Sequence, residues 1–132
     1  MGIKLKEENI KLTLRILLGF IFAFSGIAKL FSPDLLISNL WQIIQHETLV
    51  TFAVYVFSTI EIIFGMILII YDLRPVKVTA VCSLLVFIIY LSYKVITNDP
   101  NSCGCMGGVL LMTHTQSLIQ DLFYLSVGIY IL

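Results

Sequence analysis

Charged residues are scarce in this sequence. Its 132 residues include only 8 Lys and Arg and 8 Asp and Glu, together 12% of the chain. Soluble domains usually carry about 25% charged residues. Apolar residues make up 59% of the chain, and its mean hydropathy is +1.02. The shortage of charge excludes an ordinary soluble domain and indicates an integral membrane protein.

The sequence also has no excess of positive charge. Its formal net charge is zero, and it contains no basic tract interleaved with aromatic residues. Nucleic-acid-binding proteins need such a basic surface, so nucleic acid is excluded as a partner. The length suits one small bundle. We therefore expect a single all-α membrane domain over residues 1–132 surrounded by the lipid bilayer, with its oligomeric state left open.

Four apolar segments are each near the length of a membrane span. They cover residues 12–31, 49–71, 76–96 and 117–132, and a spanning helix needs about 20 residues. The first is longer than the core of a signal peptide, and no Ala-x-Ala-like cleavage site follows it. These segments predict four transmembrane helices in an antiparallel bundle.

The positions of Lys and Arg predict how the bundle is oriented. Cationic residues flank the start of the first segment, and Arg74 and Lys77 occupy the turn between the second and third. Connections 32–48 and 97–116 contain neither Lys nor Arg. Because Lys and Arg mark the cytoplasmic side, we expect both termini inside and connection 97–116 outside. The expected location is a bacterial cytoplasmic (inner) membrane.

The connection after the first segment predicts a short helix. Ser32, Pro33 and Asp34 are typical of a helix start: a capping hydroxyl, proline at the first position and an acid near the positive dipole end. An amphipathic pattern with Trp41 follows. This favours a helix on the outer membrane surface, and an ordinary loop is the alternative.

Small and polar residues recur at helical spacing within each apolar segment. Such stripes face the interior of a membrane bundle, where small residues allow close approach and polar groups form hydrogen bonds. The stripes consist of Arg15, Gly19, Phe22, Gly26 and Lys29; Ser58, Glu61 and Gly65; Thr79, Ser83, Phe87, Tyr90 and Lys94; and Ser117, Asp121, Tyr124 and Gly128.

Glu61 lies near the middle of its segment, whereas Lys29, Lys94 and Asp121 lie near the outer ends. The nearest cation to Glu61 is Lys29, offset by about 10 Å along the axis at the helical rise of about 1.5 Å per residue. Two long side chains can bridge part of that gap. Glu61 either holds helices together or handles protons or a ligand head group.

The outward connection contains Cys103-Gly104-Cys105. Disulfides form and persist outside the cytoplasm, but so close a pair adds little stability through loop closure. Gly104 permits the tight turn that a bond between the cysteines would need, and strained, exposed disulfides tend to be labile or catalytic. The pair therefore predicts thiol–disulfide exchange.

Charged residues at the outer helix ends support this interpretation. Lys29 and Lys94 could favour a thiolate, the attacking species in exchange. Asp121 could pair with a lysine or accept a proton. Cys82 lies about 20 Å from the pair by helical rise, and we expect it to be a buried core residue. With a single dithiol, electrons must pass to a partner protein, a small thiol or a quinone, which is the candidate cofactor.

Two other functions use the same connection. Cysteine, methionine and histidine are soft or borderline ligands that suit Cu(I) or Zn(II), although the spacing matches no standard zinc module. A purely structural glycine-rich turn is the third interpretation. The candidate metal ligands are Cys103, Cys105, Met106, Met112 and His114.

Several stretches resemble MauE/DoxX-type redox-associated membrane proteins. They are residues 15–33 (RILLGFIFAFSGIAKLFSP), Glu61 with Gly65, and residues 103–107 (CGCMG) followed by Asp121. The last is similar to the family's Cys-Gly-Cys-Phe-Gly signature, with methionine in place of phenylalanine. The resemblance implies a four-helix membrane bundle linked to disulfide formation or electron transfer outside the cytoplasm. It also implies an extracytoplasmic thioredoxin-like or disulfide-containing partner on a separate chain.

Together these features predict a membrane thiol–disulfide redox protein, a candidate oxidoreductase. Its redox pair would be Cys103 and Cys105. The supporting or proton-handling residues would be Lys29, Glu61, Lys94 and Asp121.

Overall fold

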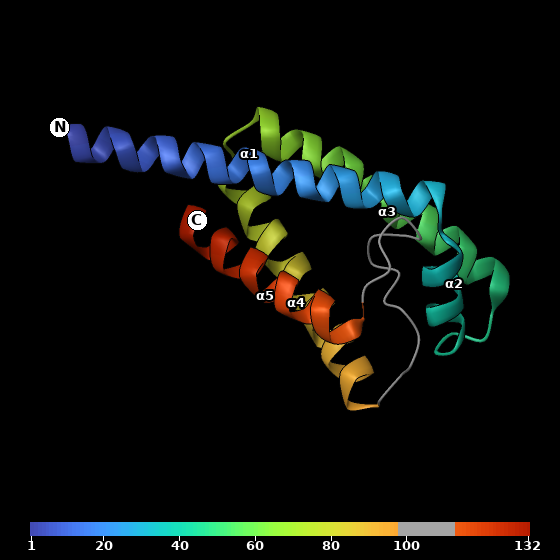
Figure 1. Ribbon diagram of the computed structural model, residues 1–132. Coiled ribbons are helices and arrows are strands. Elements are labelled where there is room, and N and C mark those ends of the chain that lie inside the picture. The colour runs from blue at the N-terminus through green and yellow to red at the C-terminus, as the bar shows by residue number, and fades with distance from the viewer. Residues whose placement is uncertain (98–112) are drawn as a thin grey trace.

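The computed structural model describes residues 1–97 and 113–132, and most of these residues are helical (Figure 1). In chain order the helices are α1 (Gly2–Phe31), α2 (Asp34–Trp41), α3 (Glu47–Ile70), α4 (Arg74–Ile96) and α5 (His114–Ile131). The all-α class predicted from the sequence is confirmed for this part of the chain.

Three of the described helices are long and apolar enough to cross a membrane: α1, α3 and α4. The 18-residue α5 is not among them. Large apolar side chains on all of these helices point outward; Phe57, Val86 and Phe123, for example, are 67%, 66% and 64% exposed. A water-soluble protein rarely exposes so much apolar surface. The chain is a multi-pass membrane protein, and the fourth span stays a prediction.

All four long helices begin earlier than the apolar segments that predicted them, α3 and α4 by two residues each and α1 and α5 by more. α1 starts at Gly2 instead of residue 12, because its polar first turns are also helical and carry an ion pair between Lys11 and Glu7 at 2.9 Å. α5 starts at His114 instead of residue 117, because Thr113 and Gln116 form a capping box. The Thr113 hydroxyl accepts from the Gln116 amide, and the Gln116 side chain accepts from the Thr113 amide.

The short helix after the first span is present, but its start differs from the prediction. Pro33 occupies the position before the helix, and no side chain caps it, so the predicted capping role of Ser32 is wrong. α2 lies against α3. Its Asn39 is only 1% exposed. A place for α2 at the membrane surface remains a proposal.

The long helices form two antiparallel pairs (Figure 1). α1 packs closely along α3, and α4 along α5, whereas contacts between the pairs are fewer. Figure 1 shows the pairs approaching each other near the C-terminus and diverging toward α2. The buried core between them consists of Leu18, Phe22, Leu68, Ala80, Leu84 and Ile131.

Glycines allow α1 and α3 to touch backbone to backbone. A methyl group on Gly65 would lie 2.5 Å from the Gly19 carbonyl oxygen and 2.6 Å from the Ala23 nitrogen. A methyl on Gly26 would lie 2.6 Å from the carbonyl oxygen of Ser58. Small residues are the usual means of such close packing in membranes, so this pair is fixed in one register.

Burial confirms most of the predicted stripes and corrects the one on α4. The stripe residues of α1 and α3 are all buried, and those of α5 are buried or half-buried. On α4, however, Thr79 is exposed, while Ala80, Leu84 and Leu91 face inward. The Thr79 hydroxyl donates to the Pro75 carbonyl of its own helix at 2.8 Å, so it needs no partner across the bundle.

Cys82 is exposed, which contradicts its predicted burial. It lies two residues from both Ala80 and Leu84. Each residue turns the helix by about 100°, so Cys82 faces away from the side that these two residues bury.

Candidate functional site

The central feature of the bundle is a buried ion pair between α1 and α3. The Lys29 ammonium donates hydrogen bonds to both carboxylate oxygens of Glu61, at 2.8 Å to Oε1 and 2.7 Å to Oε2. Lys29 is 3% exposed and Glu61 9% exposed. Buried charges are normally paired in this way because an isolated one is very costly.

The helix register explains how these two residues meet. Gly19 faces Gly65 and Gly26 faces Ser58 across the α1–α3 contact, so Lys29 lies opposite residue 55. Glu61 is six residues further along α3, about 9 Å at the helical rise of about 1.5 Å per residue. Side chains lean toward the N-terminus of their own helix. In an antiparallel pair the two side chains therefore lean toward each other and close the gap.

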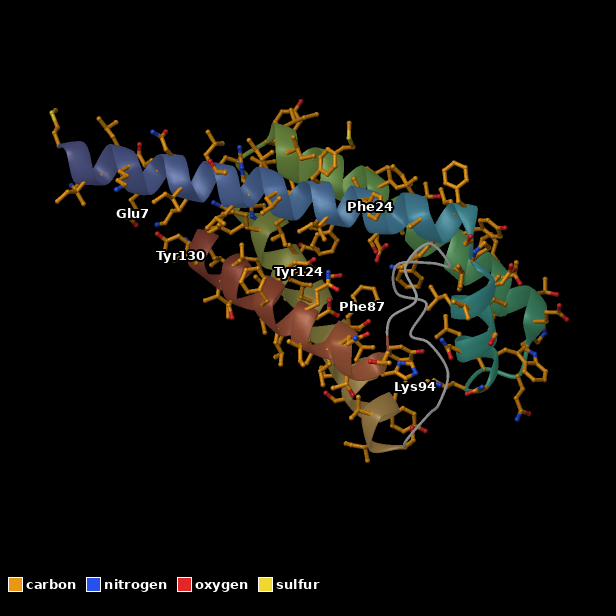
Figure 2. All side chains as sticks on the ribbon, in the orientation of Figure 1. Glu7, Phe24, Phe87, Lys94, Tyr124 and Tyr130 are labelled. Carbon is orange, nitrogen blue, oxygen red and sulfur yellow. The ribbon has the colours of Figure 1, made fainter. Side chains whose placement is uncertain are left out.

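A cavity of about 50 Å³ adjoins the ion pair and reaches α4 and α5. Phe87 of α4 covers the ammonium, with its ring centroid 5.0 Å from Lys29 Nζ, a cation–π contact. Figure 2 shows the Phe87 ring between α1 and the α4–α5 pair. The polar residues that line the cavity are Ser25, Lys29, Glu61, Ser117, Gln120, Asp121 and Tyr124.

Asp121 adds a second carboxyl group to this cavity. It is on the second turn of α5, and among the described residues it forms no ion pair. Gln120, one residue earlier, donates a hydrogen bond to the Tyr124 hydroxyl. The site thus combines one cation, two carboxyl groups and hydroxyl groups inside the bundle. Such a set can hold a proton and pass it between neighbouring groups.

The size of the cavity limits what it can hold. One water needs roughly 10–15 Å³, whereas a cavity of about 150 Å³ is known to bind benzene. At about 50 Å³, this one has room for a few waters and not for a quinone ring. A quinone ring therefore does not fit inside this cavity as the described residues line it, and a quinone stays a candidate cofactor predicted from the sequence alone.

Lys94 lies apart from the cavity, at the end of α4 (Figure 2). It is 3% exposed, and its ammonium donates to the Gln42 side-chain oxygen at 3.3 Å and the Asn39 carbonyl at 3.5 Å. Lys94 therefore joins α4 to α2. Of the four predicted supporting residues, the structure gathers Lys29, Glu61 and Asp121 but not Lys94.

The predicted redox pair, Cys103 and Cys105, and the predicted metal ligands Met106 and Met112 lie outside the described residues. The helix ends that flank them are described. α4 ends at Ile96, two residues after buried Lys94, and α5 begins with His114, which is 4% exposed. The first turns of α5 also line the cavity beside Lys29. Both helix ends thus lie in the half of the bundle that holds the ion pair.

Two polar residues of this region were missed in the sequence. Asn39 follows Leu36 by three residues and precedes Leu40, so it is a polar residue on the apolar face of α2, and that position signals burial. Gln120 is beside Asp121, and its position four residues before Tyr124 indicates a helical hydrogen bond.

The fold and this buried site define a multi-pass helical membrane protein with a charged centre. The chain belongs to the MauE family, because the family model for methylamine utilisation protein MauE matches residues 7–132. It is also similar to Protein TlpB of Flavobacterium psychrophilum, at 29% identity over 138 aligned positions. That match covers 97% of this chain but only 38% of TlpB. No solved structure matches the chain.

Proposed function

We propose that the protein exchanges electrons between the Cys103–Cys105 pair and an extracytoplasmic thioredoxin-like or disulfide-containing partner. The observation that carries the proposal is the charged cluster of Lys29, Glu61 and Asp121, buried in the half of the bundle where α4 ends and α5 begins. Intramembrane ionisable residues are functional candidates by default. Membership of the MauE family supports a redox role, as the resemblance implied.

The exchange is a two-electron step between one disulfide and one dithiol. A thiolate of the reduced chain attacks a sulfur of the other chain's disulfide, so a mixed disulfide forms and one thiolate leaves. The second thiol then attacks the mixed disulfide and releases the reduced partner. One disulfide breaks and another forms, and two protons pass from the chain that is oxidised to the chain that is reduced. Asp121 is the proposed proton acceptor, and the ion pair holds the charge beside it.

The proposed topology places both termini in the cytoplasm and the cysteines outside a bacterial cytoplasmic membrane. Cationic residues support it: Arg15 and Lys77 approach the same Asp72 carboxylate, at 3.5 and 2.8 Å. The cationic start of α1 and the cationic turn are therefore at one end of the bundle. The cysteine connection, which has no Lys or Arg, joins helix ends at the other end.

Thiol trapping in intact cells tests the proposal. A membrane-impermeant maleimide is applied with and without prior reduction, to the wild type and to a Cys103→Ser/Cys105→Ser variant. We expect labelling of the wild type only after reduction. The double variant retains Cys82 and is the control for labelling at that position. A Cys105→Ser variant should then trap the partner as a mixed disulfide.

Two results would contradict the proposal. If the double variant still oxidises or reduces the partner, the pair is not the redox centre. If both thiols are free and labelled without reduction, and the purified reduced protein binds stoichiometric copper or zinc, the metal-binding alternative replaces exchange. Its ligands would be Cys103, Cys105, Met106 and His114.

A further inference from the structure

A second cavity lies at the opposite end of the bundle, where the two helix pairs meet. Its volume is about 280 Å³, and its charged lining residues are Glu8, Lys11, Arg15, Asp72 and Lys77. This is just below the roughly 300–1,000 Å³ of typical small-molecule pockets. It suits a head-group-sized ligand better than a large cofactor.

Arg15 is the main feature of this cavity. It is 7% exposed. Within the described part of the chain, its Nε and Nη1 atoms are buried without a hydrogen-bond partner. Nη1 lies 3.5 Å from Asp72 Oδ1, an ion-pair contact that is not a hydrogen bond. Leaving buried donors of a charged group unmet is costly, so the guanidinium has capacity for an acceptor that the chain itself does not provide.

The charge balance of the cavity favours an anion. Three cations line it, against the two carboxylates of Glu8 and Asp72. The Asp72 carboxylate pairs mainly with Lys77, whose Nζ lies 2.8 Å from Asp72 Oδ1. The hydrogen bond from Lys77, together with the charges of Lys77 and Arg15, holds the pKa of Asp72 below its usual value. This leaves Arg15 as the cation whose charge is least neutralised.

The depth of the cavity indicates which anions it meets. Residues 71–73 join α3 to α4, both long and apolar enough to span the membrane. A connection between spans cannot lie in hydrocarbon, where its backbone would be unsatisfied. Because Asp72 lines the cavity, the cavity is at the membrane surface. Lys11 lies at the same membrane surface, and its ammonium is 5.7 Å from the ring centroid of Tyr130. Figure 2 shows Tyr130 beneath α1, near Glu7.

We propose that this cavity binds a phosphate oxyanion through the guanidinium of Arg15, with Lys77 and Lys11 as further donors. Arginine matches phosphate with two parallel N–H donors. Basic pockets between membrane helices at the cytoplasmic surface commonly hold anionic lipid head groups. The phosphate can belong to such a lipid or to free phosphate, and the chemistry of recognition is the same. The site is separate from the Lys29–Glu61 cluster.

Lipid retention measured by native mass spectrometry tests the site. The full chain is purified in neutral detergent and offered phosphatidylglycerol, phosphatidylcholine or inorganic phosphate. Wild-type protein should retain phosphatidylglycerol in preference to phosphatidylcholine. Competition by millimolar phosphate would identify the free ion as a ligand too. If inorganic phosphate does not displace the retained phosphatidylglycerol, the lipid is the ligand of this site. Equal retention of the two lipids, with no effect of phosphate, would overturn the proposal.

Variants place the binding at this cavity. Arg15→Gln should weaken phosphatidylglycerol binding about tenfold or more, the effect of losing a charged hydrogen bond. The matched control is Arg74→Gln, an exposed cation at the same end that does not line the cavity, which should change binding less than about twofold. If Arg15→Gln does not fold, Lys77→Gln should still weaken binding about fivefold. Equal effects of cavity and control variants would refute the assignment.

Discussion

Lys29 and Glu61 form two hydrogen bonds in a setting where either charge alone would be unsatisfied. The contribution of such a pair to stability depends on whether one partner or both partners are replaced. Breaking a buried pair leaves one uncompensated charge, whereas replacing both partners removes the cost of burying them. The same two residues can therefore look essential or dispensable, depending on which change is made.

We expect Glu61→Gln to lower the free energy of unfolding by about 3–5 kcal/mol, because Lys29 would keep its charge without a carboxylate. The Lys29→Met/Glu61→Gln double variant should recover much of that loss. Denaturant titration of the detergent-solubilised protein measures both. The control is Glu7→Gln, which removes the exposed ion pair with Lys11 and should cost only about 0–1 kcal/mol. A double variant less stable than Glu61→Gln would contradict the argument.

The sequence predicted this centre because its residues follow a helical repeat. Lys29, Glu61 and Asp121 stand out as ions in apolar segments, and their spacing placed them on inward faces. The direct bond between Lys29 and Glu61 was less predictable, since it depends on the α1–α3 register and on the lean of both side chains. Asn39 and Gln120 were missed because a neutral amide in a short or partly polar helix gives a weaker signal than a charge.

The α1–α3 pair depends on glycine at the points of backbone contact. Gly65→Ala should reduce the free energy of unfolding by about 1–3 kcal/mol, because its methyl group would press on the Gly19 carbonyl at 2.5 Å. Alanine's better helix propensity returns at most about 1 kcal/mol. Thermal unfolding in detergent measures the change.

Gly2→Ala is the matched control for this test, since no atom lies within 4 Å of a methyl group there. It should leave stability unchanged or slightly raised. Equal melting temperatures for Gly65→Ala and the wild type would show that the two helices can separate at no cost.

The helices themselves were largely predictable, and their ends were less so. Apolar length located α1, α3, α4 and α5, but the first turns of α1 and α5 are polar and lie outside the apolar segments. For α5, the Thr113-x-x-Gln116 spacing of a capping box marks the true start. On α4 the polar-stripe rule misplaced Thr79, because a hydroxyl can bond to its own helix and then carries no information about the inward face.

The divergence of the two helix pairs could not be predicted from single-helix patterns. Periodicity shows which face of each helix is buried but not which helices share that burial. Here the glycines of α1 and α3 lie in the contact between these two helices. α5 contacts α1 less extensively than α3 does. The cavity beside the ion pair lies between the two helix pairs, and its polar lining residues come from α1, α3 and α5.

The distribution of Lys and Arg also predicts the orientation of the bundle in the membrane. In a background without Cys82, Cys103 and Cys105, single cysteines are placed at Glu47 and Leu73, both exposed and at opposite ends of α3. Because Arg74 and Lys77 adjoin Leu73, the positive-inside rule puts Leu73 in the cytoplasm. An impermeant maleimide should label the Glu47→Cys protein in intact cells, and the Leu73→Cys protein only after lysis. The reverse pattern would place the cysteine connection in the reducing cytoplasm, where a stable disulfide is not expected.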